Sequence, residues 1–167
     1  ESWGLCDGVC QGLSNLLSGF IAGMRHVPGI RDGARRTYDA EHTLIKALVE
    51  NKEAQRLANE WLHSCGIKED LVPAPLHGDA NESSDSYSIA LRRDYENISV
   101  NLANVGTGIA QALPIVAELA QCHDATVLII EQPELHLHPK AQLWLLKLVL
   151  ERLNHCNFLI ETHSEIL

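Results

Sequence analysis

The sequence has no apolar run that approaches the roughly 18 residues needed by a membrane-spanning helix, so we expect no membrane partner. It is also poor in basic residues, with 13 Lys and Arg against 22 Asp and Glu and a formal net charge of −9. This balance argues against a broadly basic nucleic-acid surface, although a local basic strip remains compatible with it.

Paired cysteines are lacking as well. The five cysteines are odd in number and irregularly spaced, which does not indicate a disulfide framework and favours a cytoplasmic location. Hydrophobic residues make up 46% of the sequence and charged residues 21%, which is typical of a globular protein. The 167 residues suffice for one domain with a real core.

Hydrophobic periodicity predicts the elements of the first half of the chain. Apolar residues at helical spacing predict a helix with one buried face within residues 1–27. A second helix is expected over residues 41–65, with Gly66 as its C-terminal stop. Residues 71–86 have the composition of a loop.

The second half shows a different pattern. Alternating apolar residues in 87–102 predict an antiparallel hairpin with one buried face. A helix interrupted or begun by Pro114 follows. Residues 126–131 read as a strand buried on both faces, residues 139–154 as a helix, and residues 157–161 as a second strand. This strand–helix–strand order predicts parallel pairing with a right-handed crossover.

Three chemistry-bearing stretches occur in sequence order. Gly106-Thr107-Gly108 precedes a helix, acids follow the first predicted parallel strand at 131–134, and 161–164 reads ETHS after the next. Ligands of parallel sheets collect at the carboxyl ends of strands. There a carboxylate typically holds Mg²⁺, a glycine turn offers backbone N–H groups to phosphate, and a histidine such as His163 contacts a terminal phosphate or a water. Together these are parts of a nucleoside triphosphate site.

Other interpretations stay open at this point. The glycines can form a simple turn. A metal-dependent hydrolase is a further hypothesis, with a site built from Glu131, Glu134, His136 and His138. The arginines of the Pro- and Gly-rich segment 26–38 form either a solvated turn or an anion-contacting cluster, and its histidine, His26, is interpreted as an ordinary surface or packing residue.

The stretches NVGTGIAQALPIVAEL (104–119), VLIIEQPELHLHPKAQ (127–142) and FLIETHSEIL (158–167) together resemble the ABC-type ATPase core of the AAA/OLD-like ATPases, relatives of the SMC and RecF-type DNA-repair ATPases. The resemblance implies an α/β fold: a partial P-loop NTPase (ABC-type) core with parallel strands, preceded by a helical segment and an antiparallel hairpin. It divides the chain into a helical and loop segment at 1–86 and the C-terminal part of the core at 87–167.

The resemblance also implies roles for individual residues. Glu131 takes the place of the Walker B acid that holds Mg²⁺, Gln132 stands where ABC-type enzymes usually carry the catalytic glutamate, and His163 matches the switch histidine that senses the γ-phosphate. Leu135–His138 matches the D-loop, with His138 near the dimer face and the nucleotide. The signature motif, which touches ATP bound on the opposite subunit, corresponds to Asn104, Gly106, Thr107, Gly108 and Gln111.

Two departures from the family pattern bear on activity. Gln132 cannot act as a general base because an amide does not titrate, so it can only orient a water, and Glu134 is a candidate helper. No G-x-x-x-x-G-K-[ST] motif occurs in the 167 residues. Because the chain starts without Met and stops just after His163, we expect the P-loop half upstream and further sequence downstream.

The expected function is ATP binding and hydrolysis, with ATP and Mg²⁺ as cofactors, by a head that dimerises around the nucleotide with a second ATPase head. A homodimer is expected, and DNA repair or phage defence, with DNA as a partner, rests on family analogy alone. The alternative is a nucleotide-sensing or degenerate head that acts as a dimerisation or partner-binding module.

Overall fold

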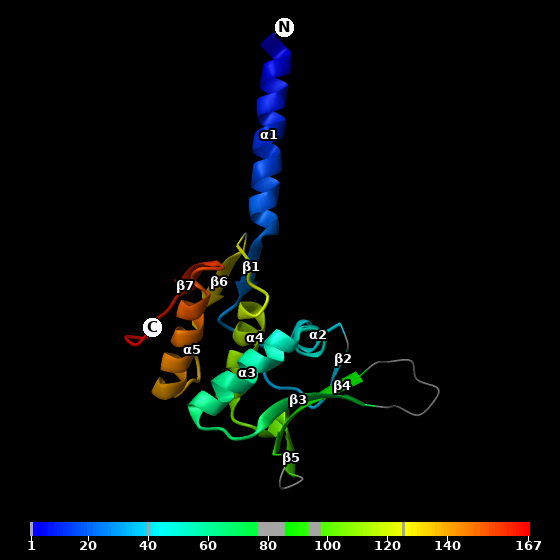
Figure 1. Ribbon diagram of the computed structural model, residues 1–167, viewed down its shortest axis with the longest axis vertical. Coiled ribbons are helices and arrows are strands. Elements are labelled where there is room, and N and C mark those ends of the chain that lie inside the picture. Colours follow the sequence, from blue (N-terminus) through cyan, green and yellow to red (C-terminus); the bar gives the residue numbers. More distant parts are fainter. Residues whose placement is uncertain (1, 40, 77–85, 94–97, 125) are drawn as a thin grey trace, which may run out of the picture.

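The computed structural model describes residues 2–39, 41–76, 86–93, 98–124 and 126–167. Two sheets lie at opposite ends of the main body, with helices α3 and α4 between them (Figure 1). The elements are α1 (Ser2–Ala22), β1 (Met24–Val27), β2 (Tyr38–Asp39), α2 (Thr43–Glu50), α3 (Lys52–Cys65), β3 (Asp70–Leu76), β4 (Ser86–Arg93), β5 (Ile98–Asn101), the 3₁₀ turn η1 (Leu102–Asn104), α4 (Thr107–Leu119), β6 (Val127–Glu131), α5 (Pro139–Arg152) and β7 (Asn157–Glu161).

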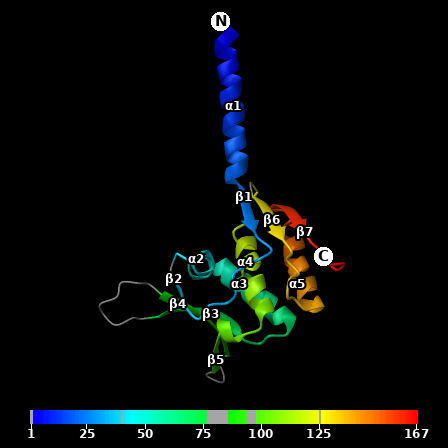
Figure 2. The same cartoon turned by 180° about the vertical axis from the view of Figure 1, so that it is seen from behind.

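The parallel sheet has the order β1-β6-β7, so β6 is its central strand (Figure 2). The predicted strand–helix–strand unit is confirmed as β6, α5 and β7, with β6 and β7 parallel. Pro139 occupies the first turn of α5 and His138 is its N-cap, as expected for a helix that starts with proline. Strand β1 corrects the sequence interpretation, because Met24–Val27 was assigned to the first helix and instead pairs with Val127–Ile130.

Only one face of this sheet is buried. Leu128 and Ile130 have no exposed surface, whereas Val127 and Ile129 are partly exposed and Leu159 is 62% exposed. The prediction of a strand buried on both faces is therefore wrong for β6, because α4 and α5 do not cover the face that carries the odd-numbered residues of β6. Side chains alternate between the two faces of a strand, so Glu131 lies on the same open face as Val127 and Ile129, at the carboxyl end of β6.

The predicted antiparallel hairpin is confirmed as β4 and β5, which belong to a second sheet of order β2-β4-β3. Strand β3 is a correction, because its residues were predicted as loop; residues 77–85 of that prediction lie outside the described residues. Proline is tolerated on an edge strand when its missing N–H faces away from the ladder. The N–H of Leu71 donates outward to Asn59 Oδ1 at 2.8 Å, and Pro73 and Pro75 share its side of the strand.

The helix predicted over residues 41–65 is two helices. Asn51 has an extended backbone and caps α3, where its side-chain oxygen accepts from the N–H groups of Glu53 (2.9 Å) and Ala54 (3.4 Å). Gly66 ends α3 as predicted, with φ at +94°, in the left-handed region that favours glycine. The fully buried side chains of the core come mainly from α2, α3, α4 and β6.

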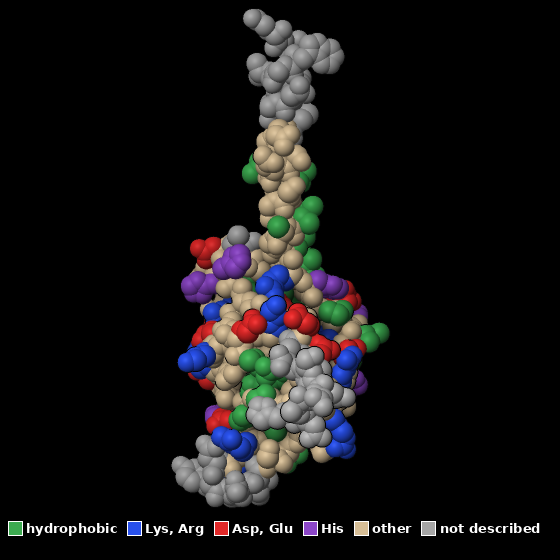
Figure 3. Space-filling model, turned by 90° about the vertical axis from the view of Figure 1, so that its right-hand side faces the viewer, with side chains coloured by type: hydrophobic (Ala, Val, Ile, Leu, Met, Phe, Trp, Pro, Cys, Tyr) green, Lys and Arg blue, Asp and Glu red, His purple; other side chains and the backbone are tan. Residues whose placement is uncertain are grey.

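Helix α1 projects away from the body, and the predicted buried face is not found on its described side chains (Figure 1). Figure 3 shows apolar side chains along its surface. The exposed set is Leu13, Leu16, Leu17, Phe20 and Ile21, each more than half exposed. No helix among the described residues combines the length and the apolar character required to cross a membrane.

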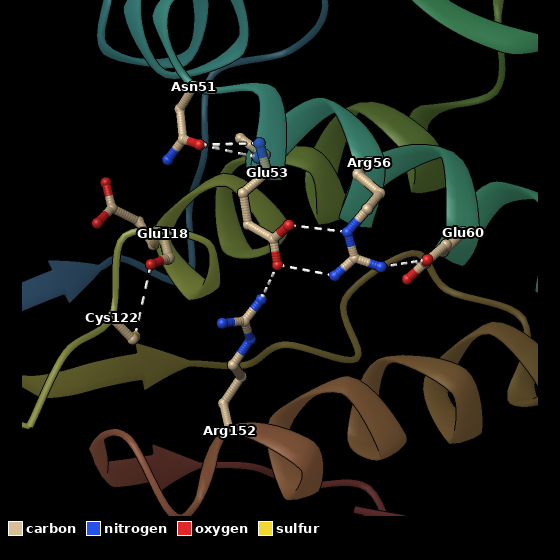
Figure 4. A network of polar contacts seen from close by, with 8 residues as sticks. Asn51, Glu53, Arg56, Glu60, Glu118, Cys122 and Arg152 are labelled. Carbon is tan, nitrogen blue, oxygen red and sulfur yellow. Dashed lines mark hydrogen bonds and ion pairs between the residues drawn. The ribbon is translucent and has the colours of Figure 1, made fainter.

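An ion-pair network joins α3 to α5 (Figure 4). The Glu53 carboxylate accepts from Arg56 Nε at 2.8 Å and Nη2 at 2.7 Å, and from Arg152 of α5. The hydrogen bonds from Arg56 are the main cause that lowers the pKa of Glu53 to about 2; burial opposes the shift, and Arg152 adds to it. The network ties the helix after β6 to the central helix of the body.

Candidate functional site

The predicted acids and the predicted histidine meet at the carboxyl ends of β6 and β7. Glu131 and Glu161 end these strands in register, and the segment after each strand lies at the same edge of the sheet. The Gln132 N–H donates to Glu161 O at 2.7 Å, which joins the two strand ends. The sequence pattern therefore located the edge of the sheet at which polar residues gather.

Glu131 presents a carboxylate with contacts to both oxygens. Its Oε1 lies 2.9 Å from His26 Nε2, and its Oε2 accepts from the Gly29 N–H at 3.0 Å. The hydrogen bond from Gly29, followed by that from His26, lowers the pKa of Glu131. A carboxylate that stays ionised at a strand end is a suitable Mg²⁺ ligand, and His26 contacts one of the oxygens that would hold the ion.

Gln132 has a left-handed backbone with φ at +45°, which is uncommon for a residue other than glycine. Its carbonyl accepts from the Leu135 N–H at 3.2 Å and from Arg31 Nη2 at 3.1 Å. Its side chain lies against Gly29, where an added Cβ would stand 3.1 Å from Gln132 Oε1. The backbone of Gln132 is therefore held by its surroundings, and its side chain lies against Gly29, on the strand end next to Glu131.

Glu134 clamps the segment after β7. Its Oε2 accepts from the Thr162 hydroxyl at 2.8 Å and its Oε1 from the His163 N–H at 2.8 Å. Burial raises the pKa of Glu134, but the hydrogen bonds from the backbone and from Thr162 outweigh it and the net shift is downward. Since both oxygens are engaged, the geometry makes Glu134 a support for His163, whose own side chain is exposed.

The segment between β6 and α5 carries the two neighbouring histidines. His138 is exposed, and its Nδ1 accepts from the Lys140 N–H at 3.3 Å. His136 is exposed and has φ at +63°. Among the residues that the structure describes, no three His, Cys, Asp or Glu side chains converge in a way that could hold a metal ion, so the hypothesis of a cage built from Glu131, Glu134 and these histidines finds no support in this arrangement.

The predicted signature segment begins α4 close to this loop. Gly106 is the N-cap, and Asn104, Gly106 and Thr107 are exposed. A Cβ added to Gly108 would lie 2.6 Å from the carbonyl oxygen of His136, so only glycine allows this approach. The start of α4 therefore lies directly against the loop that follows β6.

A pocket of about 310 Å³ opens at this approach. It is bounded by the start of α4, by the loop before α5 and by the end of α3. The side chains and backbone that line it include Trp61, Gly106, Gly108, His136, His138 and Lys140. The exposed start of α4 and Lys140 border this largely apolar pocket, and a helix N-terminus and a lysine both favour an anionic ligand.

Gln111 points inward instead of toward the exposed start of α4. It is 7% exposed, and its Nε2 donates to the carbonyl oxygen of Arg31 at 3.1 Å. Arg31 is itself 8% exposed and donates to the carbonyls of Glu131 and Gln132. The structure thus separates Gln111 from Asn104, Gly106 and Thr107, and joins it to the end of β6.

Sequence reasoning did not connect three residues with the end of β6: His26, Gly29 and Arg31, of which Arg31 had been named only as part of a solvated turn or an anion-contacting cluster. They lie about 100 residues from Glu131 in sequence, and the parallel pairing of β1 with β6 brings them to it. The Pro- and Gly-rich composition after β1 was the available signal, and one of its two interpretations was a solvated arginine turn. That interpretation is wrong for the buried Arg31. The exposed Arg35 pairs with Asp32, and the exposed Arg36 lies 3.5 Å from Asn104 Oδ1 of the predicted signature segment.

Comparison with known proteins places this geometry in a family. No curated protein matches the chain. A family model, the AAA ATPase domain, matches residues 33–167. The matched span begins after Arg31, and it includes the ends of β6 and β7 and the start of α4. Because this span covers most of the 167 residues, the chain belongs to the AAA ATPase domain family.

Proposed function

We propose that the chain forms part of a head that binds ATP with Mg²⁺ and hydrolyses it. The observation that carries this proposal is the arrangement of Glu131, Gln132 and His163 at the adjacent ends of two parallel strands, with Glu134 bonded across to the backbone of His163. Family membership supports the nucleotide chemistry. The roles of single residues are our inference from the geometry and from the resemblance to ABC-type ATPases.

In this proposal Glu131 is a ligand of Mg²⁺ and the ion offsets charge on the phosphates. Gln132 orients the attacking water by hydrogen bonding, since its amide cannot take a proton. The exposed side chain of His163 contacts the terminal phosphate. Catalysis then rests on positioning and on charge stabilisation, as is usual for phosphoryl transfer.

The chain contains no P-loop motif, so the proposal requires one from outside these 167 residues. Strand β7 is an edge of the described parallel sheet. A parallel strand added there would end beside His163 and Glu131, where a glycine-rich turn could hold the β- and γ-phosphates.

The start of α4 is proposed to serve a second head. Asn104, Gly106 and Thr107 are exposed, and their N–H groups and side chains are available to nucleotide bound on the opposite subunit. His138, exposed at the start of α5, would lie at the same dimer face. Gln111 contributes through Arg31. A role in DNA repair or phage defence is proposed from the family resemblance alone.

ATP turnover by the intact protein tests the proposal. Glu131→Gln and His163→Ala should each lower kcat by about 100-fold or more, since the first removes the charge that holds Mg²⁺ and the second removes the contact with the terminal phosphate. His155→Ala, an exposed histidine after α5, is the matched control and should leave turnover unchanged. Unaltered turnover in both site variants would refute the role assignments. ATP binding without turnover by the unmodified protein would instead favour a nucleotide-sensing head.

A further inference from the structure

Arg31 is a buried cation beside the proposed site, and its hydrogen bonds go to backbone carbonyls. Its Nη1 donates to Pro28 O at 3.0 Å and to Glu131 O at 3.1 Å, and its Nη2 donates to Gln132 O at 3.1 Å. Among the described residues, no carboxylate accepts a hydrogen bond from it. The Glu134 carboxylate interacts with it electrostatically, but burial has the larger effect and the pKa of Arg31 is lowered. Because a buried charge is costly, its carbonyl acceptors must be well placed.

The two contacted carbonyls flank the backbone turn at Gln132. Arg31 reaches the carbonyl of Glu131 with one nitrogen and that of Gln132 with the other, which fixes the two peptide units on either side of the Gln132 Cα. The left-handed conformation of Gln132 costs free energy for a residue with a side chain, and it persists only if the surroundings hold it. The flat, forked guanidinium suits this bridge, which an ammonium group cannot reproduce.

Arg31 also connects this turn to α4. The Gln111 side chain, buried in α4, donates to the carbonyl oxygen of Arg31. The exposed start of the same helix carries the residues that we propose contact nucleotide on a second head. A displacement of α4 would therefore act on the backbone of Arg31, and through its side chain on Gln132.

We propose that Arg31 is a positioning residue for ATP hydrolysis, whose guanidinium sets the backbone, and thereby the water-orienting amide, of Gln132 and links it to α4 through Gln111. This inference rests on the proposed function for its catalytic part. Its structural part, the hold on the turn at Gln132, is independent of any activity. The two parts can therefore be tested separately.

Hydrogen exchange tests the structural part. In Arg31→Met, the Gln132 and Leu135 amides should exchange at least about 10-fold faster, because the turn that these N–H groups stabilise loses its support. Exchange in α3 should stay unchanged. Arg35→Met, which removes an exposed arginine four residues further on, is the matched control and should change neither region. Unchanged exchange at Gln132 and Leu135, or an increase that extends equally over α3, would overturn the inference.

Kinetics test the catalytic part. Arg31→Met should lower kcat for ATP about 100-fold with KM little changed, since a small misplacement of a reacting group has this effect. Arg31→Lys should restore only part of the rate. If Arg31→Met does not fold, Arg31→Lys serves in its place and should lower kcat with KM little changed, because an ammonium group cannot bridge both carbonyls.

The outcomes are distinguishable. A raised KM with unchanged kcat in Arg31→Met would contradict a positioning role, and so would full rescue by lysine. If the unmodified protein binds but does not hydrolyse ATP, the proposed function and the catalytic part of the inference both fail, while the exchange experiment still decides whether Arg31 holds the turn at Gln132.

Discussion

The backbone N–H of His163 donates to the carboxylate of Glu134 at 2.8 Å, across 29 residues of sequence. This bond, with that of the Thr162 hydroxyl to the same carboxylate, joins the loop after β6 to the segment after β7. A displacement of either segment is therefore expected to displace the other.

Glu134→Gln should lower ATP turnover about 10-fold, because the amide keeps one acceptor oxygen but replaces the other with a donor that faces an N–H or a hydroxyl. Exchange of the His163 amide should accelerate in parallel. Glu165→Gln, an exposed acid of the same segment, should be neutral in both measurements. A loss beyond about 1,000-fold with unaltered exchange at His163 would indicate a general base instead of a support.

Gln132→Glu should raise kcat for ATP about 10-fold near neutral pH, since a carboxylate can accept the proton of the attacking water. The rate should then fall at acidic pH as the new carboxyl group becomes protonated, a dependence that the amide cannot produce. Steady-state rates from pH 5 to 8 would show this. Gln132→Asn keeps an amide and should show no increase; an equal increase in that variant would contradict the explanation.

Gly108→Ala should destabilise the fold by about 1–3 kcal/mol and reduce turnover, because its Cβ would meet the His136 carbonyl at 2.6 Å and force the start of α4 away from the loop. Urea unfolding followed by tryptophan fluorescence would measure the stability change. Gly33→Ala is the control, since a Cβ there meets no atom within 4 Å and should change stability by less than about 0.5 kcal/mol. Equal effects at both positions would contradict the close approach.

The ion-pair network at Glu53 should make stability depend on pH. The pKa of this carboxyl is lowered on folding from 4.5 to about 2, so its contribution is complete above pH 4.5 and is lost as the pH falls toward 2. Glu53→Gln should cost about 1 kcal/mol at pH 7, a cost that diminishes over this acidic range. Glu60→Gln, which removes a partner of Arg56 only, should cost less. A difference that grows at acidic pH would contradict the assignment.

The elements with a strong local pattern were predictable from the sequence. The β6–α5–β7 unit, the hairpin of β4 and β5, and the stop at Gly66 agree with the expected spacing and turn residues. The break between α2 and α3 was missed although Asn51, a preferred N-cap residue, was a visible signal. The helical spacing of apolar residues does not reveal such a break, because α2 and α3 each bury an apolar face with that spacing.

Long-range pairing explains the other misses. Strand β1 has only four residues, and its sequence continues the apolar spacing of the preceding helix; pairing with β6 determines its state. The same pairing brings His26 and Arg31 to Glu131, which no local pattern could reveal. By contrast, the position of Glu131 and of the segment that contains His163 at the carboxyl edge of the sheet was predictable, because each ends or follows a predicted parallel strand. The roles of Glu131, Gln132 and His163 stay predictions.

The outer edge of β3 has a consequence for self-association. Its outward-facing backbone positions are Leu71, whose N–H is taken by Asn59, and Pro73 and Pro75, which have none. A strand from another molecule that approached this edge would find carbonyls but no amide donors over five residues. Edge-to-edge pairing of the β-sheet with another molecule is therefore disfavoured at β3, and the two prolines protect this edge against aggregation.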